Sequence, residues 1–156
     1  MSPSVNPIPD DYPRVIPSLV VDGAAQAIDF YREVLGATER LRMDGPDGRI
    51  GHAELQIGES VIFVADEFPE MEFVGPKKIG GSPVTVMVYV EDVDATFERA
   101  TKGGAKVTRP VEDQFYGDRV GQFEDPFGHR WSIATHVEDV SPEEMEKRAA
   151  AMGEGG

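Results

Sequence analysis

The first part of the chain shows two successive patterns of apolar residues: a continuous apolar run and then apolar residues at helical spacing. Residues 15–21 form an apolar run typical of a β-strand. The residues that follow place apolar side chains at helical spacing, and Gly36 comes where such a helix would end. This stripe consists of Ala24, Ala27, Ile28, Tyr31 and Leu35. The pattern predicts a strand followed by a helix that packs its apolar side on a sheet.

Three more strands are expected after this helix, at residues 38–43, 50–57 and 60–65. The Gly58-Glu59 pair between the last two strands favours a two-residue hairpin turn. Such a turn pairs Ile57 with Ser60 and, counting back, Glu54 with Phe63. Because paired residues share a face, the alternation predicts which side chains of this hairpin lie together.

The same order of elements returns about 70 residues later. A strand is expected at 84–90 and a helix at 92–102, followed by strands at 105–111, 119–124 and 130–136. A repeated strand–helix–strand–strand–strand unit implies two similar half-sheets with a site between them. The sequence therefore predicts an α+β fold of two βαβββ modules that form a cupped mixed sheet.

The repeat also divides the chain, whose length fits one domain. We expect an N-terminal arm at 1–14, module one at 15–66, a connection at 67–83, module two at 84–136 and a tail at 137–156. Phe68, Met71 and Phe73 make the connection unusually apolar, so it either folds over a cavity as a lid or caps the edge of the core. In the tail, residues 141–144 match a capping box that starts a short helix, which docks on the body or on a second subunit.

Composition narrows the possible partners. The chain has 29 acidic and 15 basic side chains, a net charge of −14 and no cysteine. This excludes disulfides and thiolate chemistry and disfavours nucleic acid and anionic membranes as partners. The charge reflects either a solvated surface or a preference for a cationic ligand. The N-terminus lacks a basic start and an apolar stretch, and the chain has no membrane-length apolar run, so a cytoplasmic protein is expected.

Three stretches carry a resemblance to a known superfamily. They are Asp29-Phe30-Tyr31 with Leu35-Gly36-Ala37, residues 90–94, and Asp125-Pro126-Phe127-Gly128. In this order they resemble the vicinal oxygen chelate superfamily of glyoxalases, bleomycin resistance proteins and dioxygenases over residues 15–136. Residues 115–136, from Phe115 through Trp131 to His136, are similar to its PhnB-like branch. The resemblance implies modules that pair into a cup and a homodimer that builds its pockets from both subunits.

The resemblance also implies where a metal would bind. Metal enzymes of the superfamily hold a divalent ion with His, Gln or Glu from the first and fourth strands of each module. These positions correspond here to Ile16, Phe63, Thr85 and Ser132. Hydrocarbon side chains offer no donor atom and neutral hydroxyls bind divalent ions weakly. We therefore expect no metal cofactor, and none of the lyase, isomerase or dioxygenase mechanisms that depend on it.

Other polar residues are expected on the same faces. His52, Glu54 and Gln56 should lie with Phe63, and Arg119 and His136 with Ser132. His52 and Glu54 are candidates for acid–base catalysis, with Arg119 binding an anionic group. Alternatively, His52, Glu54 and His136 hold a relocated metal. The structural alternative is that His52 and Glu54 only hydrogen-bond each other while Arg119 pairs with Asp118 or Glu124.

The remaining candidates are ligand-binding residues that line or rim the cup, unless they pack at a subunit interface. They are Gln56, Phe63, Thr85, Met87, Tyr89, Tyr116 and Ser132, whereas Trp131 should face the opposite side. Three functions follow: a protein that holds a small organic molecule without a metal, an enzyme that uses His52, Glu54 and Arg119, or a metabolite sensor.

Overall fold

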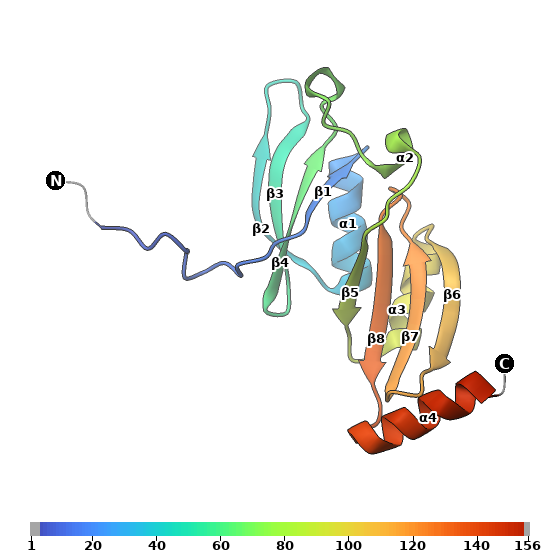
Figure 1. The fold of residues 1–156 in the computed structure, drawn as a ribbon. Helices are drawn as coiled ribbons and strands as arrows, with labels where there is room; N and C mark the ends of the chain where they lie inside the picture. Colours follow the sequence, from blue (N-terminus) through green and yellow to red (C-terminus); the bar gives the residue numbers. More distant parts are fainter. Residues whose placement is uncertain (1–3, 155–156) are drawn as a thin grey trace. The chain divides into compact units, whose positions relative to one another are not determined.

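The computed structural model describes residues 4–154 (Figure 1). The chain divides into two compact units, the first ending at Gly81 and the second beginning at Ser82. Each unit contains one four-stranded sheet and repeats the same order of elements, so each is described by itself. The predicted α+β fold of two βαβββ modules is confirmed.

The first unit is built around sheet 1, whose strands lie in the order β1-β4-β3-β2. Strand β1 runs parallel to β4, and the other neighbours are antiparallel. The elements are β1 (Ser18–Val21), α1 (Ala24–Leu35), β2 (Thr38–Asp44), β3 (Ile50–Ile57) and β4 (Ser60–Asp66). Strand β1 is shorter than predicted, because Pro17 has no N–H to donate and only its carbonyl, which accepts from Phe63 N at 2.9 Å, joins the ladder.

The second unit repeats this arrangement in sheet 2, with the strand order β5-β8-β7-β6 and β5 parallel to β8. Its elements are β5 (Thr85–Tyr89), α3 (Val93–Lys102), β6 (Lys106–Asp113), β7 (Asp118–Glu124) and β8 (Arg130–His136). Two register shifts interrupt the pairing of β6 with β7. The predicted strands and helices are all present, and no end is displaced by more than three residues.

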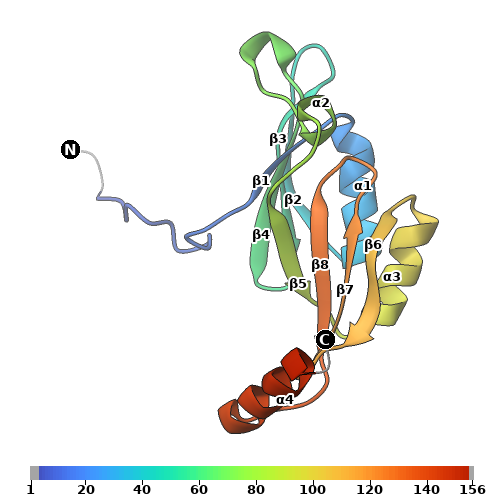
Figure 2. The ribbon, with the colours of Figure 1, turned by 45° about the vertical axis from the view of Figure 1, so that its right-hand side comes forward.

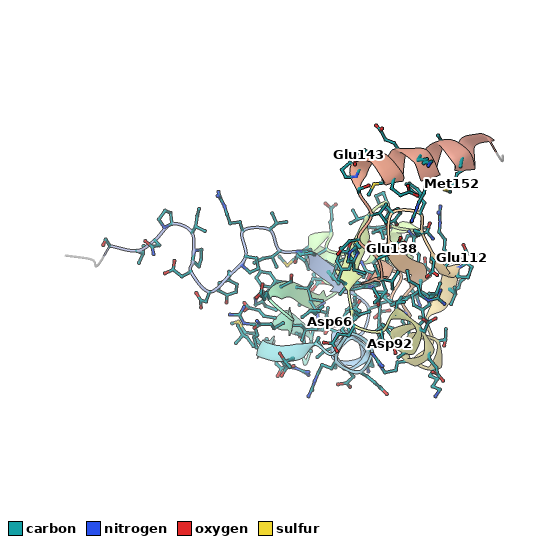
Figure 3. All side chains as sticks on the ribbon, turned by 90° about the horizontal axis from the view of Figure 1, so that it is seen from below. Asp66, Asp92, Glu112, Glu138, Glu143 and Met152 are labelled. Atoms are coloured by element: carbon teal, nitrogen blue, oxygen red, sulfur yellow. The ribbon has the colours of Figure 1, made fainter. Side chains whose placement is uncertain are left out.

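One helix covers one face of each sheet. The predicted stripe of α1 is buried, together with Phe30 and Val34. Asp66, at the end of β4, ties the helix to the sheet because its carboxylate accepts from the backbone N–H of Ala24 and of Ile50, both at 2.7 Å. Figure 3 labels Asp66 beside α1 and Asp92 beside α3, where Asp92 accepts from Ala95 N as the N-cap.

Close packing of α3 on sheet 2 requires a glycine on β7. A Cβ placed on Gly121 would lie 2.6 Å from a ring carbon of Phe97 and 2.8 Å from a methyl carbon of Val111. Phe97 in turn packs edge-to-face against the buried Phe123. Trp131 is completely buried on this face, as predicted.

The connection between the modules forms the 3₁₀ helix η1 (Pro69–Met71) and the short helix α2 (Pro76–Ile79). The guanidinium group of Arg49 lies 4.1 Å above the ring of Phe68 and also pairs with Glu70. Met71 and Phe73 are exposed. Both expected roles of the connection, as a lid or as a cap on the core edge, stay predictions.

The tail forms helix α4 (Pro142–Glu154), which is drawn in red in Figure 2. Ser141 begins this helix as predicted, because its hydroxyl accepts from Glu144 N at 3.2 Å. Arg148 of the helix donates to the carbonyl of Phe115 and to Glu138, the residue labelled in Figure 3 between β8 and α4. Of the two expected docking modes, the structure shows contact with the body of the same chain.

Asp125 is a buried carboxylate of the second unit that accepts hydrogen bonds from three groups, and it gives a test of the fold. It is 3% exposed and accepts from Phe127 N, His129 N and the indole Nε1 of Trp131. We expect Asp125→Ala to lower the free energy of unfolding by about 3 kcal/mol, because it leaves a buried indole N–H without an acceptor. Urea unfolding measures this change. The exposed Asp29 is the matched control, and equal stability of Asp125→Ala and Asp29→Ala would contradict the prediction.

Candidate functional site

The face of each sheet opposite its helix is here called its open face. On sheet 1 the register pairs Ile57 with Ser60 and Glu54 with Phe63, as predicted from the hairpin. Ala53 and Leu55 point to the opposite side and are fully buried beneath α1. His52, Glu54, Gln56 and Phe63 therefore share the open face of sheet 1.

Glu54 is at the centre of this face and is only 5% exposed. His52 donates from Nε2 to its Oε2 at 2.8 Å, and the Tyr12 hydroxyl donates to its Oε1 at 2.7 Å. Burial acts to raise the pKa of Glu54, but the hydrogen bonds from His52 and Tyr12 outweigh it and lower the pKa below its ordinary value. The carboxylate is thus held ionised with both oxygens occupied.

Tyr12 belongs to the N-terminal arm and was not predicted as a site residue. Its ring lies edge-to-face with Phe63, at 6.3 Å between centroids, and the guanidinium of Arg40 lies 4.6 Å above it. The hydrogen bond to Glu54 raises the pKa of the Tyr12 hydroxyl. A lone aromatic residue among prolines and aspartates is the sequence signal that marks Tyr12, since such a side chain favours apolar cover.

His52 and Gln56 differ in how their polar groups are oriented on the open face of sheet 1. The His52 ring packs edge-to-face on Phe63, with 4.6 Å between centroids, and its side chain is about one-third exposed. Gln56 instead turns its amide to the carbonyl of Gly58 at 3.0 Å. The predicted hydrogen bond between His52 and Glu54 is confirmed, and it is an arrangement in which a carboxylate orients an imidazole.

The open face of sheet 2 carries aromatic and thioether side chains. Met87 pairs with Ser132 in the register, and Met87 and Tyr89 are 48% and 60% exposed. Thr85 lies on the same side, two residues before Met87, and is also exposed. The predicted sharing of one face by Thr85, Met87, Tyr89 and Ser132 is thus confirmed, while their role in ligand binding stays a prediction.

A pocket of about 380 Å³ lies where β6 and β7 pair irregularly. Tyr116, predicted as a rim residue, is part of its lining. The other lining residues are Arg109, Pro110, Glu112, Gln114, Val120, Gly121 and Gln122. The sequence does not predict Arg109 and Gln122 as site residues. They are paired across β6 and β7 only because of two register shifts, which the sequence pattern does not show.

A second buried carboxylate, Asp118, begins β7 and is 4% exposed. The Tyr89 hydroxyl donates to its Oδ2 at 2.7 Å, and His136 Nδ1 donates to its Oδ1 at 2.8 Å. His136 Nε2 lies 2.7 Å from an oxygen of the exposed Asp139. The sequence predicts Asp118 only as a partner for Arg119, whereas its pairing with His136 in the register makes it the link between Tyr89 and the tail.

The predicted position of Arg119 is wrong. The β7–β8 register pairs Arg119 with Thr135, and Ser132 with Gln122, so Arg119 lies on the opposite face from Ser132. Its guanidinium makes two hydrogen bonds to Asp94 of α3 and one to Asp113. The expected pairing with Asp118 or Glu124 is also wrong. The error arose because the turn at 125–129 has five residues, and the sequence of a turn of this length does not fix how β7 and β8 align.

The side chains at the four expected metal positions do not fit a divalent ion. Ile16 and Phe63 offer only carbon, and Thr85 and Ser132 offer neutral hydroxyls. Within residues 4–154, no three His, Asp or Glu side chains are grouped as metal ligands would be. A relocated metal held by His52, Glu54 and His136 stays a prediction, because these residues belong to different units. No helix of the described chain has the length and hydrophobicity needed to cross a bilayer.

Comparison with known proteins agrees with this geometry. The Glyoxalase/Bleomycin resistance protein/Dioxygenase superfamily model matches residues 14–133. An uncharacterized protein of Mycobacterium tuberculosis is 43% identical over 92% of this chain and 86% of its own. The lactoylglutathione lyase of Neisseria meningitidis is 28% identical over 72% of this chain and 82% of its own.

Solved structures show the same fold. A PhnB protein from Bacillus cereus has a TM-score of 0.64 over 79% of this chain and 99% of its own, at 14% identity. At this identity the likeness concerns the fold alone. The chain belongs to the glyoxalase/bleomycin resistance protein/dioxygenase superfamily, as the sequence motifs predicted.

The His136 cluster predicts a pH dependence of stability. Hydrogen bonds to Asp139 and Asp118 raise the pKa of His136 above its ordinary value of 6.5. The stabilisation is thus complete below pH 6.5 and is lost as the pH rises through the raised value. We expect the difference in unfolding free energy between the wild type and His136→Gln to shrink from pH 5.5 to pH 9.

Urea unfolding across this pH series measures that difference. Asp139→Asn removes one of the two acceptors of His136 and should make the difference less dependent on pH. A gap that stays constant or widens with rising pH would show that protonated His136 does not stabilise the fold.

Proposed function

We propose that this protein binds a small organic molecule against the open face of one of its sheets, without the divalent ion used by metal-dependent members of the superfamily. The proposal rests on one observation above all. The four positions that correspond to metal ligands hold Ile16, Phe63, Thr85 and Ser132, a set that offers carbon and alcohol groups.

The side chains around these positions support a flat, partly apolar ligand. Each sheet offers such a surface by itself. On sheet 2, Met87 and Tyr89 expose large surfaces beside Thr85. On sheet 1, Phe63 provides an aromatic edge beside His52. The pocket beside β6 adds polar groups from Arg109, Gln122 and Tyr116. An apolar surface with a few polar side chains is typical of sites for small organic molecules.

The proposal predicts that the protein binds its ligand in the absence of a metal. Protein purified without chelator should contain far less than one Ni, Zn, Mn or Fe per chain by elemental analysis. An aromatic ligand from a compound panel should stabilise the metal-free protein, by about 2.7 kcal/mol at a concentration of 100 times its Kd. About one metal ion per chain, removable only with loss of binding, would contradict the proposal.

Variants locate this binding on sheet 2. Met87→Ala should reduce the ligand-induced rise in Tm, because Met87 contributes exposed apolar surface to the open face. Val107→Ala is the matched control, since Val107 is also partly exposed but pairs with Phe123, whose side chain lies on the helix-covered side. An equal loss in both variants would place the ligand elsewhere.

A second function is supported by the pair of His52 and Glu54. An imidazole held at 2.8 Å by a buried carboxylate is suited to accept a proton from a carbon next to a carbonyl group. The similarity to a lactoylglutathione lyase makes S-lactoylglutathione a reasonable test compound. In this alternative the protein is an enzyme, with His52 as the base and Glu54 as the carboxylate that orients it.

The enzyme alternative predicts exchange of the α-proton of S-lactoylglutathione with solvent deuterium, measured by proton NMR. His52→Asn should lower the exchange rate by about 100-fold or more, because it removes the base. Glu54→Gln should lower it as well while the protein stays folded by circular dichroism. Identical rates for the wild type and His52→Asn would end this alternative.

Homodimer formation stays a prediction, which native mass spectrometry tests in the same samples.

A further inference from the structure

The open face of sheet 1 is already occupied by a side chain of the same polypeptide. Tyr12 reaches Glu54 from an arm that forms no helix or strand between residue 4 and Ser18, as Figures 1 and 2 show. We propose that this face is a binding site for an aromatic ring that carries a hydroxyl group, that Tyr12 fills it in cis, and that a phenolic ligand binds by displacing the arm.

Three contacts of different kinds define the site. Glu54 accepts the hydroxyl proton at 2.7 Å, Phe63 packs edge-to-face against the ring, and the Arg40 guanidinium covers the ring face at 4.6 Å. An anionic acceptor, an aromatic edge and a cation over the ring are the groups that recognise a phenol. All three belong to β2, β3 and β4, so the sheet provides the site and the arm provides only its occupant.

The arm is otherwise attached lightly to this sheet. Arg40 also donates to the Asp11 carbonyl at 3.3 Å, and the hydrogen bond between Asn6 and Asp10 remains within the arm. Val5 and Val15, on either side of Tyr12, are more than four-fifths exposed. Tyr12 is therefore the main anchor of the described arm, and its release exposes the whole site.

Glu54 selects which ligand can replace Tyr12. A buried carboxylate that loses a donor is strongly disfavoured, so a competitor must bring a hydroxyl group of its own. A plain hydrocarbon ring leaves Glu54 Oε1 unsatisfied, and a ligand carboxylate meets it as a like charge. The site therefore prefers a phenol over both toluene and a benzoate. This inference rests on the proposed function and adds both a ligand class and a means of controlling access.

The experiment removes the occupant and supplies its side chain as a free molecule. We expect Tyr12→Ala to bind p-cresol, with amide chemical-shift changes in a ¹⁵N-labelled sample at residues 52, 54 and 63. Toluene should bind at least tenfold more weakly and 4-methylbenzoate not measurably. The wild type should bind p-cresol at least tenfold more weakly than Tyr12→Ala, because its site is free only when the arm is released. Val15→Ala, at the first residue after the arm, is the matched control and should behave as the wild type.

A second measurement uses the unaltered chain, in case Tyr12→Ala folds poorly. Arg14 lies in the arm two residues after Tyr12 and gives trypsin a cleavage site there. Release of the arm by p-cresol should speed cleavage after Arg14, whereas toluene at the same concentration should not. Cleavage rates are read by mass spectrometry of the released peptide.

The outcomes separate this inference from the proposed function. Equal affinity for p-cresol and toluene, shifts outside sheet 1, or unchanged cleavage at Arg14 each overturn it. If aromatic compounds stabilise the protein through Met87 while sheet 1 of Tyr12→Ala stays unshifted, the proposed function stands and the phenol site fails. If p-cresol binds as expected but a tightly held metal is found, the phenol site stands and the metal-free binding function fails.

Discussion

Burial of the Glu54 carboxylate is the constraint on which the open face of sheet 1 depends. A carboxylate that is 5% exposed needs donors for both oxygens, and the chain provides them from two places. One donor, His52, comes from the same strand, and the other, Tyr12, comes from an arm 42 residues earlier in the sequence. The second unit solves the same problem at Asp118 with Tyr89 and His136. In both units a tyrosine and a histidine hold one buried carboxylate ionised.

Most of the fold could be predicted because the hydrophobic pattern is local and occurs twice. The α1 stripe and the burial of Trp131 follow from spacings of three to four and of two residues. The Gly58-Glu59 turn follows from its leading glycine. The turn fixed the β3–β4 register, and with it the shared face of His52, Glu54 and Phe63. These side chains could be placed together without any structure.

The rest of the site could not be predicted, because it depends on contacts that no local pattern records. Arg119 was placed on the wrong face, since a five-residue turn does not fix strand alignment as a two-residue turn does. The pairing of Arg109 with Gln122 could not be predicted, because it depends on the irregular register of β6 and β7. Tyr12 lies in a segment without periodicity, and only the folded chain shows that its hydroxyl reaches Glu54.

The attachment of the arm has a practical consequence for handling the protein. A purification tag fused ahead of Met1 joins the polypeptide eleven residues before Tyr12, on the same arm whose tyrosine reaches Glu54. A tag fused after α4 joins the other unit, which holds that helix through Arg148. If Tyr12 controls access to Glu54 as proposed, preparations that differ only in the tagged end will differ in how readily small molecules reach sheet 1.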